Sequence, residues 1–203
     1  MSKPSLVCCL LLGALIAPAC STPNGETPAE MRAYSLSIRA EALEMIYDEQ
    51  PELEAEIEAA AGYAIFSNLC IHPGLMTFAN GYGILENNAT GELQHMRMFR
   101  FGIGPGIAVK GFYTLLIIDD PEVLAEAWEG AGASGGYLDA SFVFGDFGGD
   151  ATASGTFGEG ARGYIFTHTG VALEATLAFG SVSIDEGIQD EVEVVEEAGG
   201  TTE

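Results

Sequence analysis

One stretch, residues 111–128, constrains the fold more than any other part of the sequence. Residues 111–118 form an uncharged apolar run rich in β-branched and aromatic side chains, which predicts a strand that is buried on both faces. Asp119 or Asp120 can cap a helix that starts at Pro121. The apolar residues of this helix share one face, namely Val123, Leu124, Ala127 and Trp128. We expect this face to pack on the strand, and the contact between them to form the centre of the core.

Alternating apolar and polar residues predict further strands on both sides of this centre. They are expected at residues 63–66, 75–85, 93–103 and 138–144. Residues 87–91, Asn-Asn-Ala-Thr-Gly, predict a turn. The Gly-Ile-Gly-Pro-Gly sequence at residues 102–106 predicts a strand bend rather than a phosphate-binding loop, because no helix follows it directly.

The most regular alternation lies near the end of the domain. Residues 164–168 are expected to turn through Thr169 and Gly170 into a final strand. The apolar positions of that strand predict one buried face, formed by Val171, Leu173, Ala175, Leu177 and Phe179.

Two helices are expected before the strands. Thr27 and Glu30 form a capping box around Pro28, which predicts a helix that continues to about Asp48. Pro51 opens a second helix, rich in Glu and Ala, that Gly62 can close. The predicted fold class is therefore α+β, with N-terminal helices followed by a mainly antiparallel, glycine-rich β-sheet or barrel with one inserted helix.

The N-terminus has the pattern of an exported lipoprotein. Lys3 precedes an apolar run, residues 6–17, that is too short to span a bilayer as a mature helix. The sequence Leu-Ile-Ala-Pro-Ala-Cys-Ser, which ends at Ser21, resembles a bacterial lipobox. That resemblance implies acylation of Cys20 and a lipid-anchored protein of the cell envelope, at the outer membrane, on its periplasmic or surface side. The alternative is a secreted protein cut at the same bond.

These features divide the chain into five predicted parts. They are a signal peptide (1–19), a tether (20–27), N-terminal helices (28–61), a β-rich domain (62–185) and an acidic, disordered tail (186–203).

The charge of the chain bears on its partners. With 30 acidic and 7 basic residues, the formal net charge is −23, which argues against nucleic acid as a partner. Three of the basic residues, Arg97, Arg100 and Lys110, form the densest group of cations and are the candidate site for an anionic lipid headgroup. The alternative is that each pairs with one of the many carboxylates. Arg97 and Arg100 need not share a site, because residues three apart on a strand point to opposite faces unless a bulge intervenes.

The sequence contains no recognisable catalytic or metal-binding motif, and no cofactor is predicted. The histidines lack the spacing of metal ligands: His72, His95 and His168. Cys70 lies between two apolar residues and is typical of a small buried hydrophobe rather than a nucleophile. Asp146 and Asp150 could hold calcium, but a solvated turn is the default. A hydrolase that uses carboxylates is the least favoured class of function.

Several motifs between residues 60 and 184 occur in the order of one known family. Residues 61–68 (Ala-Gly-Tyr-Ala-Ile-Phe-Ser-Asn) resemble its KGYAIFPN opening, and residues 81–85 (Gly-Tyr-Gly-Ile-Leu) resemble its glycine-rich strand. Residues 112–128, 136–148 and 162–183 resemble its later segments. This is the SYLF domain family, a lipid-binding family that is also described as the actin-binding domain of yeast actin-patch proteins.

The resemblance implies a non-catalytic, membrane-anchored protein whose domain binds phospholipid or phosphoinositide. Ala61 and Ser67 replace the lysine and proline of the family motif, and few cations remain for the basic-residue chemistry of the eukaryotic members. The alternative function is that of a structural or partner-binding surface lipoprotein without a lipid site. The sequence identifies no protein partner.

Overall fold

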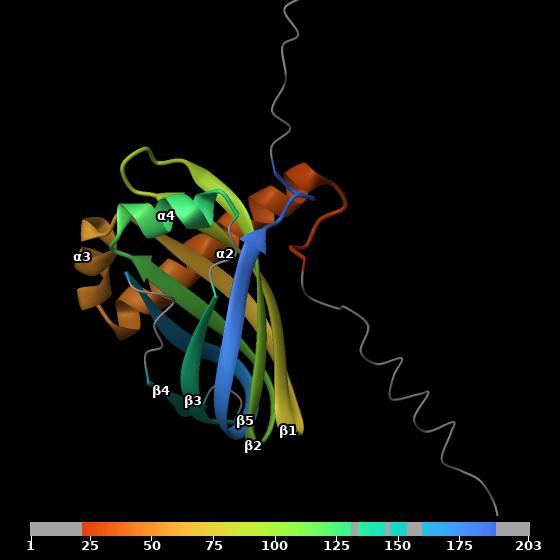
Figure 1. Cartoon of the computed structure of the whole chain (residues 1–203). Coiled ribbons are helices and arrows are strands. Elements are labelled where there is room, and N and C mark those ends of the chain that lie inside the picture. Colours follow the sequence, from red (N-terminus) through yellow and green to blue (C-terminus); the bar gives the residue numbers. More distant parts are fainter. Residues whose placement is uncertain (1–21, 131–133, 145–146, 154–159, 190–203) are drawn as a thin grey trace, which may run out of the picture.

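The computed structural model describes residues 22–130, 134–144, 147–153 and 160–189. Within these ranges, helices pack on a five-stranded antiparallel sheet (Figure 1) with the strand order β1-β2-β5-β3-β4. The helices are α2 (Pro28–Glu49), α3 (Glu52–Ala59) and α4 (Pro121–Trp128). The strands are β1 (Gly62–Asn87), β2 (Leu93–Ile118), β3 (Ser134–Phe144), β4 (Phe147–Ala153) and β5 (Ala161–Ile184). This arrangement confirms the predicted α+β fold class, with α4 as the inserted helix.

The local sequence explains where the helices begin. The Thr27 hydroxyl accepts a hydrogen bond from the backbone N–H of Glu30, and the Glu30 carboxylate accepts one from the N–H of Thr27. Asp120 caps α4 in a similar way. Both predicted starts are confirmed. The second predicted helix is shorter than expected, because α3 ends at Ala59 and Gly62 begins β1 instead of closing the helix. No helix in the described ranges combines the length and the hydropathy needed to cross a membrane.

β1 and β2 are long, continuous strands of 26 residues each. The prediction of separate short strands was wrong, because both strands continue through the glycine-rich bend, where Leu75, Gly104 and Pro105 have no ladder partner and pairing resumes on the other side. β1 and β2 pair on both sides of the bend with one register shift, next to Gly74. The turn predicted at residues 87–91 is confirmed and connects them, with the N–H of Gly91 donating to the carbonyl oxygen of Asn87 at 2.8 Å.

The sheet bends back on itself, so that the two halves of β1 lie against each other (Figure 1). Cys70 Sγ, in the first half, lies 3.0 Å from Thr77 Oγ1 in the second half. A Cβ atom at Gly83 would lie 2.0 Å from the carbonyl oxygen of Ile65, so glycine lets the two layers approach this closely. The bend gives the sheet an inward face, which it encloses, and an outward face on its convex side.

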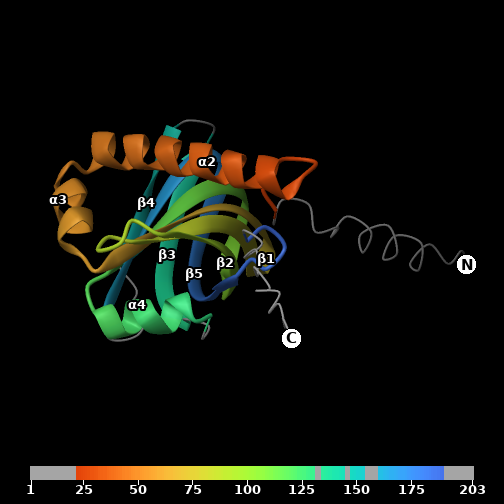
Figure 2. The ribbon, with the colours of Figure 1, turned by 90° about the horizontal axis from the view of Figure 1, so that it is seen from above.

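The helices cover the two faces near one end of the sheet. The described residues of α2 and α3 pack on outward-facing residues, in a cluster that includes Ile46, Ile65 and Leu115. On the inward face, α4 packs on Leu116 and Ile118, with Leu124 and Ala127 buried and Val123 and Trp128 partly buried. Figure 2 shows α2 and α4 on opposite sides of the strands. The predicted docking of α4 on residues 111–118 is confirmed.

β5 differs from its prediction in two respects. It is one continuous strand without a turn at Thr169 and Gly170, because Thr167 pairs with Phe112, Thr169 pairs with Gly111, and His168 is accommodated as a bulge between them. The alternation beyond the bulge is regular, but the side predicted to be buried is exposed. The residues on the outward side are Val171, Leu173, Ala175, Leu177 and Phe179, and those on the inward side are Ala172, Glu174, Thr176 and Ala178.

The packed part of the chain continues beyond β5. Ile188 is 4% exposed, and the side chain of Gln189 donates to the carbonyl oxygen of His95 at 2.5 Å. The predicted acidic tail begins at residue 186, so Ile188 and Gln189 of this segment belong to the packed structure, whereas residues 190–203 lie outside the described residues.

Candidate functional site

The outward face carries a continuous group of exposed apolar side chains at the bent end of the sheet, which we call the apolar surface. Its members are 39–73% exposed: Ile71, Leu75, Met76, Phe78, Phe99, Ile103, Ile107, Val109, Val171, Leu173, Leu177 and Phe179. They form rows across β1, β2 and β5, since paired residues on neighbouring strands point to the same side. One such row is Ile71, Val109 and Val171, and another is Met76, Ile103 and Leu177.

The apolar surface contains no charged side chain. The three strand segments that form it, residues 71–80, 99–109 and 171–181, contain only three acidic or basic residues, His72, Arg100 and Glu174, and all three are buried on the inward face. This is unusual for a chain with a net charge of −23. Large exposed apolar patches on soluble domains mark sites that bind a ligand, a partner or a membrane.

The inward face beneath the apolar surface is polar and charged. Glu174 Oε1 lies 2.9 Å from Lys110 Nζ, and Glu174 Oε2 lies 2.6 Å from His72 Nδ1. The other ring nitrogen of His72, Nε2, lies 3.0 Å from the carbonyl oxygen of Gly104. The side chains of His72, Lys110 and Glu174 are at most 1% exposed. Each strand of the bend therefore contributes one member to a buried ionic network, which we call the inner network.

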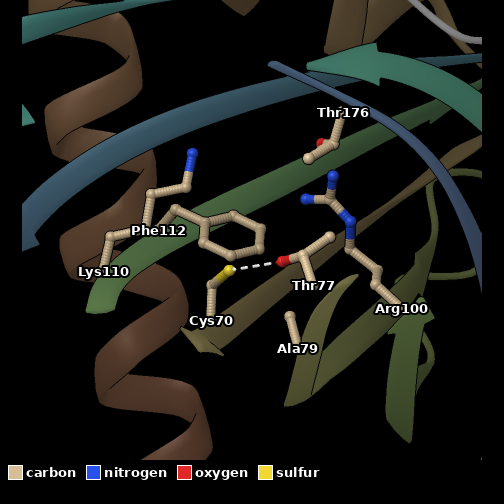
Figure 3. A pocket seen from close by; sticks show the side chains of 7 residues that line it. All are labelled: Cys70, Thr77, Ala79, Arg100, Lys110, Phe112 and Thr176. Carbon is tan, nitrogen blue, oxygen red and sulfur yellow. Dashed lines mark hydrogen bonds between the residues drawn. The ribbon is translucent and has the colours of Figure 1, made fainter. Parts of the chain in front are cut away.

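A small cavity lies next to the inner network (Figure 3). Its volume is about 10 Å³, enough for about one water molecule, and its walls are Cys70, Thr77, Ala79, Arg100, Lys110, Phe112 and Thr176. Arg100 and Lys110 both lie near the ring of Phe112, at 4.9 and 5.5 Å from its centroid. Arg100 is only 4% exposed. Two of the three predicted lipid-binding cations thus lie together, but inside the bend and away from its outer surface.

Arg97 lies on the other side of the sheet. Its side chain is 45% exposed, and its Nε lies 3.8 Å from Asp185 Oδ2. It lines a surface pocket of about 230 Å³ together with Asn80, Gly81, Met98, Phe99, Ser181 and Ser183. Phe99 belongs to both the pocket and the apolar surface, so Arg97 stands at the border of that surface. The strand rule applied above to residues three apart is confirmed for Arg97 and Arg100.

The remaining candidates from the sequence are the lipidation site Cys20, the possible calcium ligands Asp146 and Asp150, and the thiol of Cys70. Cys20 and Asp146 lie outside the described residues, and Asp150 lies in β4, whose side chains are not described. Burial raises the pKa of the Cys70 thiol to about 11, so the thiol is protonated near neutral pH and is a poor nucleophile. Among the residues that the structure describes, no group of three His, Cys, Asp or Glu side chains is arranged to hold a metal ion.

Sequence reasoning missed the apolar surface and the inner network. The sequence did contain a pattern that indicates them. His72, Lys110 and Glu174 each lie in a strand segment with no other charge nearby, at positions whose side chains point to the face opposite the neighbouring large apolar residues. Charges of opposite sign at such positions in three strands indicate a buried network, and they place the apolar residues on the other face.

Comparison with known proteins shows a similarity to a bacterial protein. No family model matches the chain. The chain is similar to Beta cell expansion factor A of Aeromonas veronii, with 26% identity over 172 residues. The aligned region covers 82% of this chain and 62% of the relative, so this chain spans less than two thirds of the relative's length. The similarity therefore extends over most of this chain, to a bacterial protein whose name states no ligand.

Proposed function

We propose that this chain is a non-catalytic, lipid-anchored protein of the bacterial envelope whose SYLF-like domain binds membrane phospholipid through the apolar surface. The observation that carries the proposal is that the outward faces of β1, β2 and β5 at the bend expose large apolar side chains and, among the side chains that the structure describes there, no charged one. Acyl chains are a suitable partner for such a surface, because contact with them removes apolar area from water and desolvates no ionic group.

Two further observations support this proposal. The motifs of residues 61–68 and 81–85 resemble those of the lipid-binding SYLF family, and Gly83 has a structural role in the close approach of the two halves of β1. The lipobox-like sequence before Cys20 would attach the chain to a membrane, which raises the local concentration of lipid near the apolar surface. Partner binding without a lipid site is the alternative, since an apolar surface also suits a protein.

A flotation experiment separates these alternatives. The Cys20→Ala chain removes the proposed acyl anchor, and we expect it to float with phospholipid vesicles. Ile107→Ser and Leu173→Ser together should abolish most of this binding with little loss of fold stability, because these side chains are 73% and 67% exposed. Leu36→Ser and Leu93→Ser, each 40% exposed and outside the apolar surface, are the matched control.

The anchor is tested separately in cells. Wild-type chain should fractionate with membranes, whereas Cys20→Ala should move substantially to the soluble fraction. Failure of the Cys20→Ala chain to bind any vesicle would refute the lipid site and favour the partner-binding alternative. An unchanged membrane fraction for Cys20→Ala in cells would refute the acyl anchor as the means of attachment.

A further inference from the structure

The most exposed side chains of the apolar surface lie together at the bend. They are Leu75 of β1, Ile107 of β2 and Leu173 of β5, which are 71%, 73% and 67% exposed. Ile107 pairs directly with Leu173, and Leu75 lies at the register shift between β1 and β2. The exposed fractions fall to 39% at Phe78 and 46% at Phe99, which lie farther from the bend. The apolar surface is therefore most accessible where the sheet bends, and we call Leu75, Ile107 and Leu173 the apolar tip.

Much of the acidic charge lies in the helices, which pack near the end of the sheet opposite the bend (Figure 1). α2 contains five acidic and two basic residues, and α3 contains four acidic and no basic ones. On α2, Glu41 accepts a hydrogen bond of 3.1 Å from the Tyr113 hydroxyl. Tyr113 is four residues from Val109 of the apolar surface, which is about 13 Å along an extended strand. The apolar tip is farther still from this carboxylate.

This distribution of charge favours an electrically neutral membrane. The Debye length is about 8 Å at physiological ionic strength, so the helix carboxylates are largely screened from a bilayer at the apolar tip. At about 10 mM salt the Debye length is about 30 Å, and the acidic helices then repel an anionic bilayer.

The cations of β2 do not offset this repulsion. Arg97, at the border of the apolar surface, is ion-paired with Asp185 at 3.8 Å. Arg100 and Lys110 are buried on the inward face. Attraction of this end of the domain to a bilayer therefore depends on apolar contact.

We infer that the apolar tip enters the acyl region of an electrically neutral, zwitterionic bilayer, with the acidic helices α2 and α3 directed away from the membrane. This inference rests on the proposed lipid function and adds to it the class of membrane and the orientation of the domain. In this orientation the apolar tip leaves water, while the charged groups of α2 and α3 keep their hydration.

Vesicle flotation of the full-length Cys20→Ala chain at two salt concentrations tests the class of membrane. Phosphatidylcholine vesicles are compared with vesicles in which phosphatidylglycerol replaces part of this lipid, at about 10 mM and about 500 mM sodium chloride. At low salt we expect the anionic vesicles to bind at least about threefold more weakly, because a single excess negative charge near an anionic membrane surface costs about that factor. High salt should bring the two compositions to within about twofold of each other.

The sign of the salt effect distinguishes this inference from binding through headgroup charge. A protein held by cations loses affinity for anionic vesicles as salt is added, whereas this chain should gain it. Equal or stronger binding to the anionic vesicles at low salt, or binding to them that weakens as salt is added, would overturn the inference and leave the lipid function intact. Absence of binding to both compositions at either salt concentration would refute the lipid function itself.

Fluorescence quenching by phosphatidylcholine with brominated acyl chains tests the orientation. The native tryptophan, Trp128, lies on α4 away from the bend and should not be quenched. Leu75→Trp adds a tryptophan at the apolar tip, and brominated lipid should remove most of the fluorescence that it contributes. Ile107→Trp repeats this test on β2. Leu93→Trp is the matched control, because Leu93 is 40% exposed and begins β2 at the end away from the bend. Quenching of Leu93→Trp as strong as that of both tip variants, or strong quenching of Trp128, would overturn the orientation.

Discussion

Glu174 provides the most demanding test of the structure, because its carboxylate joins the other two members of the inner network. It contacts Lys110 Nζ at 2.9 Å and His72 Nδ1 at 2.6 Å, and its side chain is 1% exposed. Glu174→Gln keeps the shape of the side chain and removes its charge. Lys110 would then stay buried without this carboxylate beside its ammonium group, in an interior that also contains Arg100. We expect the free energy of unfolding to fall by about 3–5 kcal/mol, the usual cost of removing one partner from a buried ion pair.

The assay is urea denaturation of the Cys20→Ala chain, followed by the fluorescence of Trp128, the single tryptophan. Asp119→Asn is the matched control, since it also converts a carboxylate to an amide in an ion pair, with Arg162 at 2.9 Å. The Asp119 side chain is 50% exposed, so its loss should cost no more than about 1 kcal/mol.

A double variant distinguishes a lost ion pair from a general packing defect. Lys110→Met with Glu174→Gln removes both charges of the pair, so its cost should be smaller than the sum of the two single variants by at least about 1 kcal/mol. If Glu174→Gln alone remains within about 1 kcal/mol of the unsubstituted chain, or if the two costs simply add, the inner network is not the buried ion pair described above.

Three shorter predictions concern other parts of the domain. Trp128→Ala should lower the free energy of unfolding by about 1–3 kcal/mol, less than the loss of a fully buried tryptophan, because Trp128 is only partly buried against the apolar residues of the inward face. Circular dichroism replaces fluorescence as the probe for this variant. Cys70 should resist alkylation by iodoacetamide until the chain unfolds, because it is 4% exposed and its pKa is raised to about 11; peptide mass spectrometry measures this, with the urea-unfolded chain as control. Burial lowers the pKa of His168, so the unfolded chain binds this proton at a higher pH than the folded chain does, and the free energy of unfolding falls as the pH drops below about 6.5. His168→Gln should reduce the slope of the free energy of unfolding against pH by up to the value for one proton. Equal slopes for the two chains in urea denaturation at several pH values would contradict this prediction.

The parts of the fold that local chemistry determines could be predicted from the sequence. The capping box at Thr27 and the cap at Asp120 use side chains that satisfy neighbouring N–H groups, so a few adjacent residues specify them. The turn at residues 87–91 is similarly local. The docking of α4 followed from the coincidence of a helical apolar face with the preceding apolar strand.

The continuity of the strands could not be predicted, because glycine has the same signature in a turn and in a bend. Gly74 and Gly170 both have positive φ angles, 124° in each case, as turn residues often do. In the structure both stay within paired strands, since long-range pairing with β2 replaces the local hydrogen bond of a turn. Only the partner strand distinguishes the two cases.

The orientation of β5 depends on one residue. His168 is accommodated as a bulge, and a single extra residue exchanges the two sides of everything that follows it. The usual assumption that apolar residues face inward then selected the wrong side. The sequence suggested Arg97, Arg100 and Lys110 as a candidate group for an anionic lipid. Alternation along β2 places Arg100 and Lys110 on the inward face and Arg97 on the outward face.

The apolar surface and the inner network are two consequences of the same alternation. Because side chains on a strand alternate between faces, placing Lys110 and Glu174 inside the bend places their apolar neighbours Ile107, Val109 and Leu173 outside. Full burial of such a side chain is worth about 1.5–3 kcal/mol, and these three are 58–73% exposed, so the isolated chain leaves several kcal/mol of this stabilisation unrealised. Contact with acyl chains would supply it, and a ligand that binds only the folded state raises stability by mass action. We therefore expect phospholipid vesicles to raise the melting temperature of the Cys20→Ala chain by several degrees, and to raise that of the Ile107→Ser, Leu173→Ser variant much less. Equal shifts for the two chains would show that the vesicles stabilise the domain through another surface.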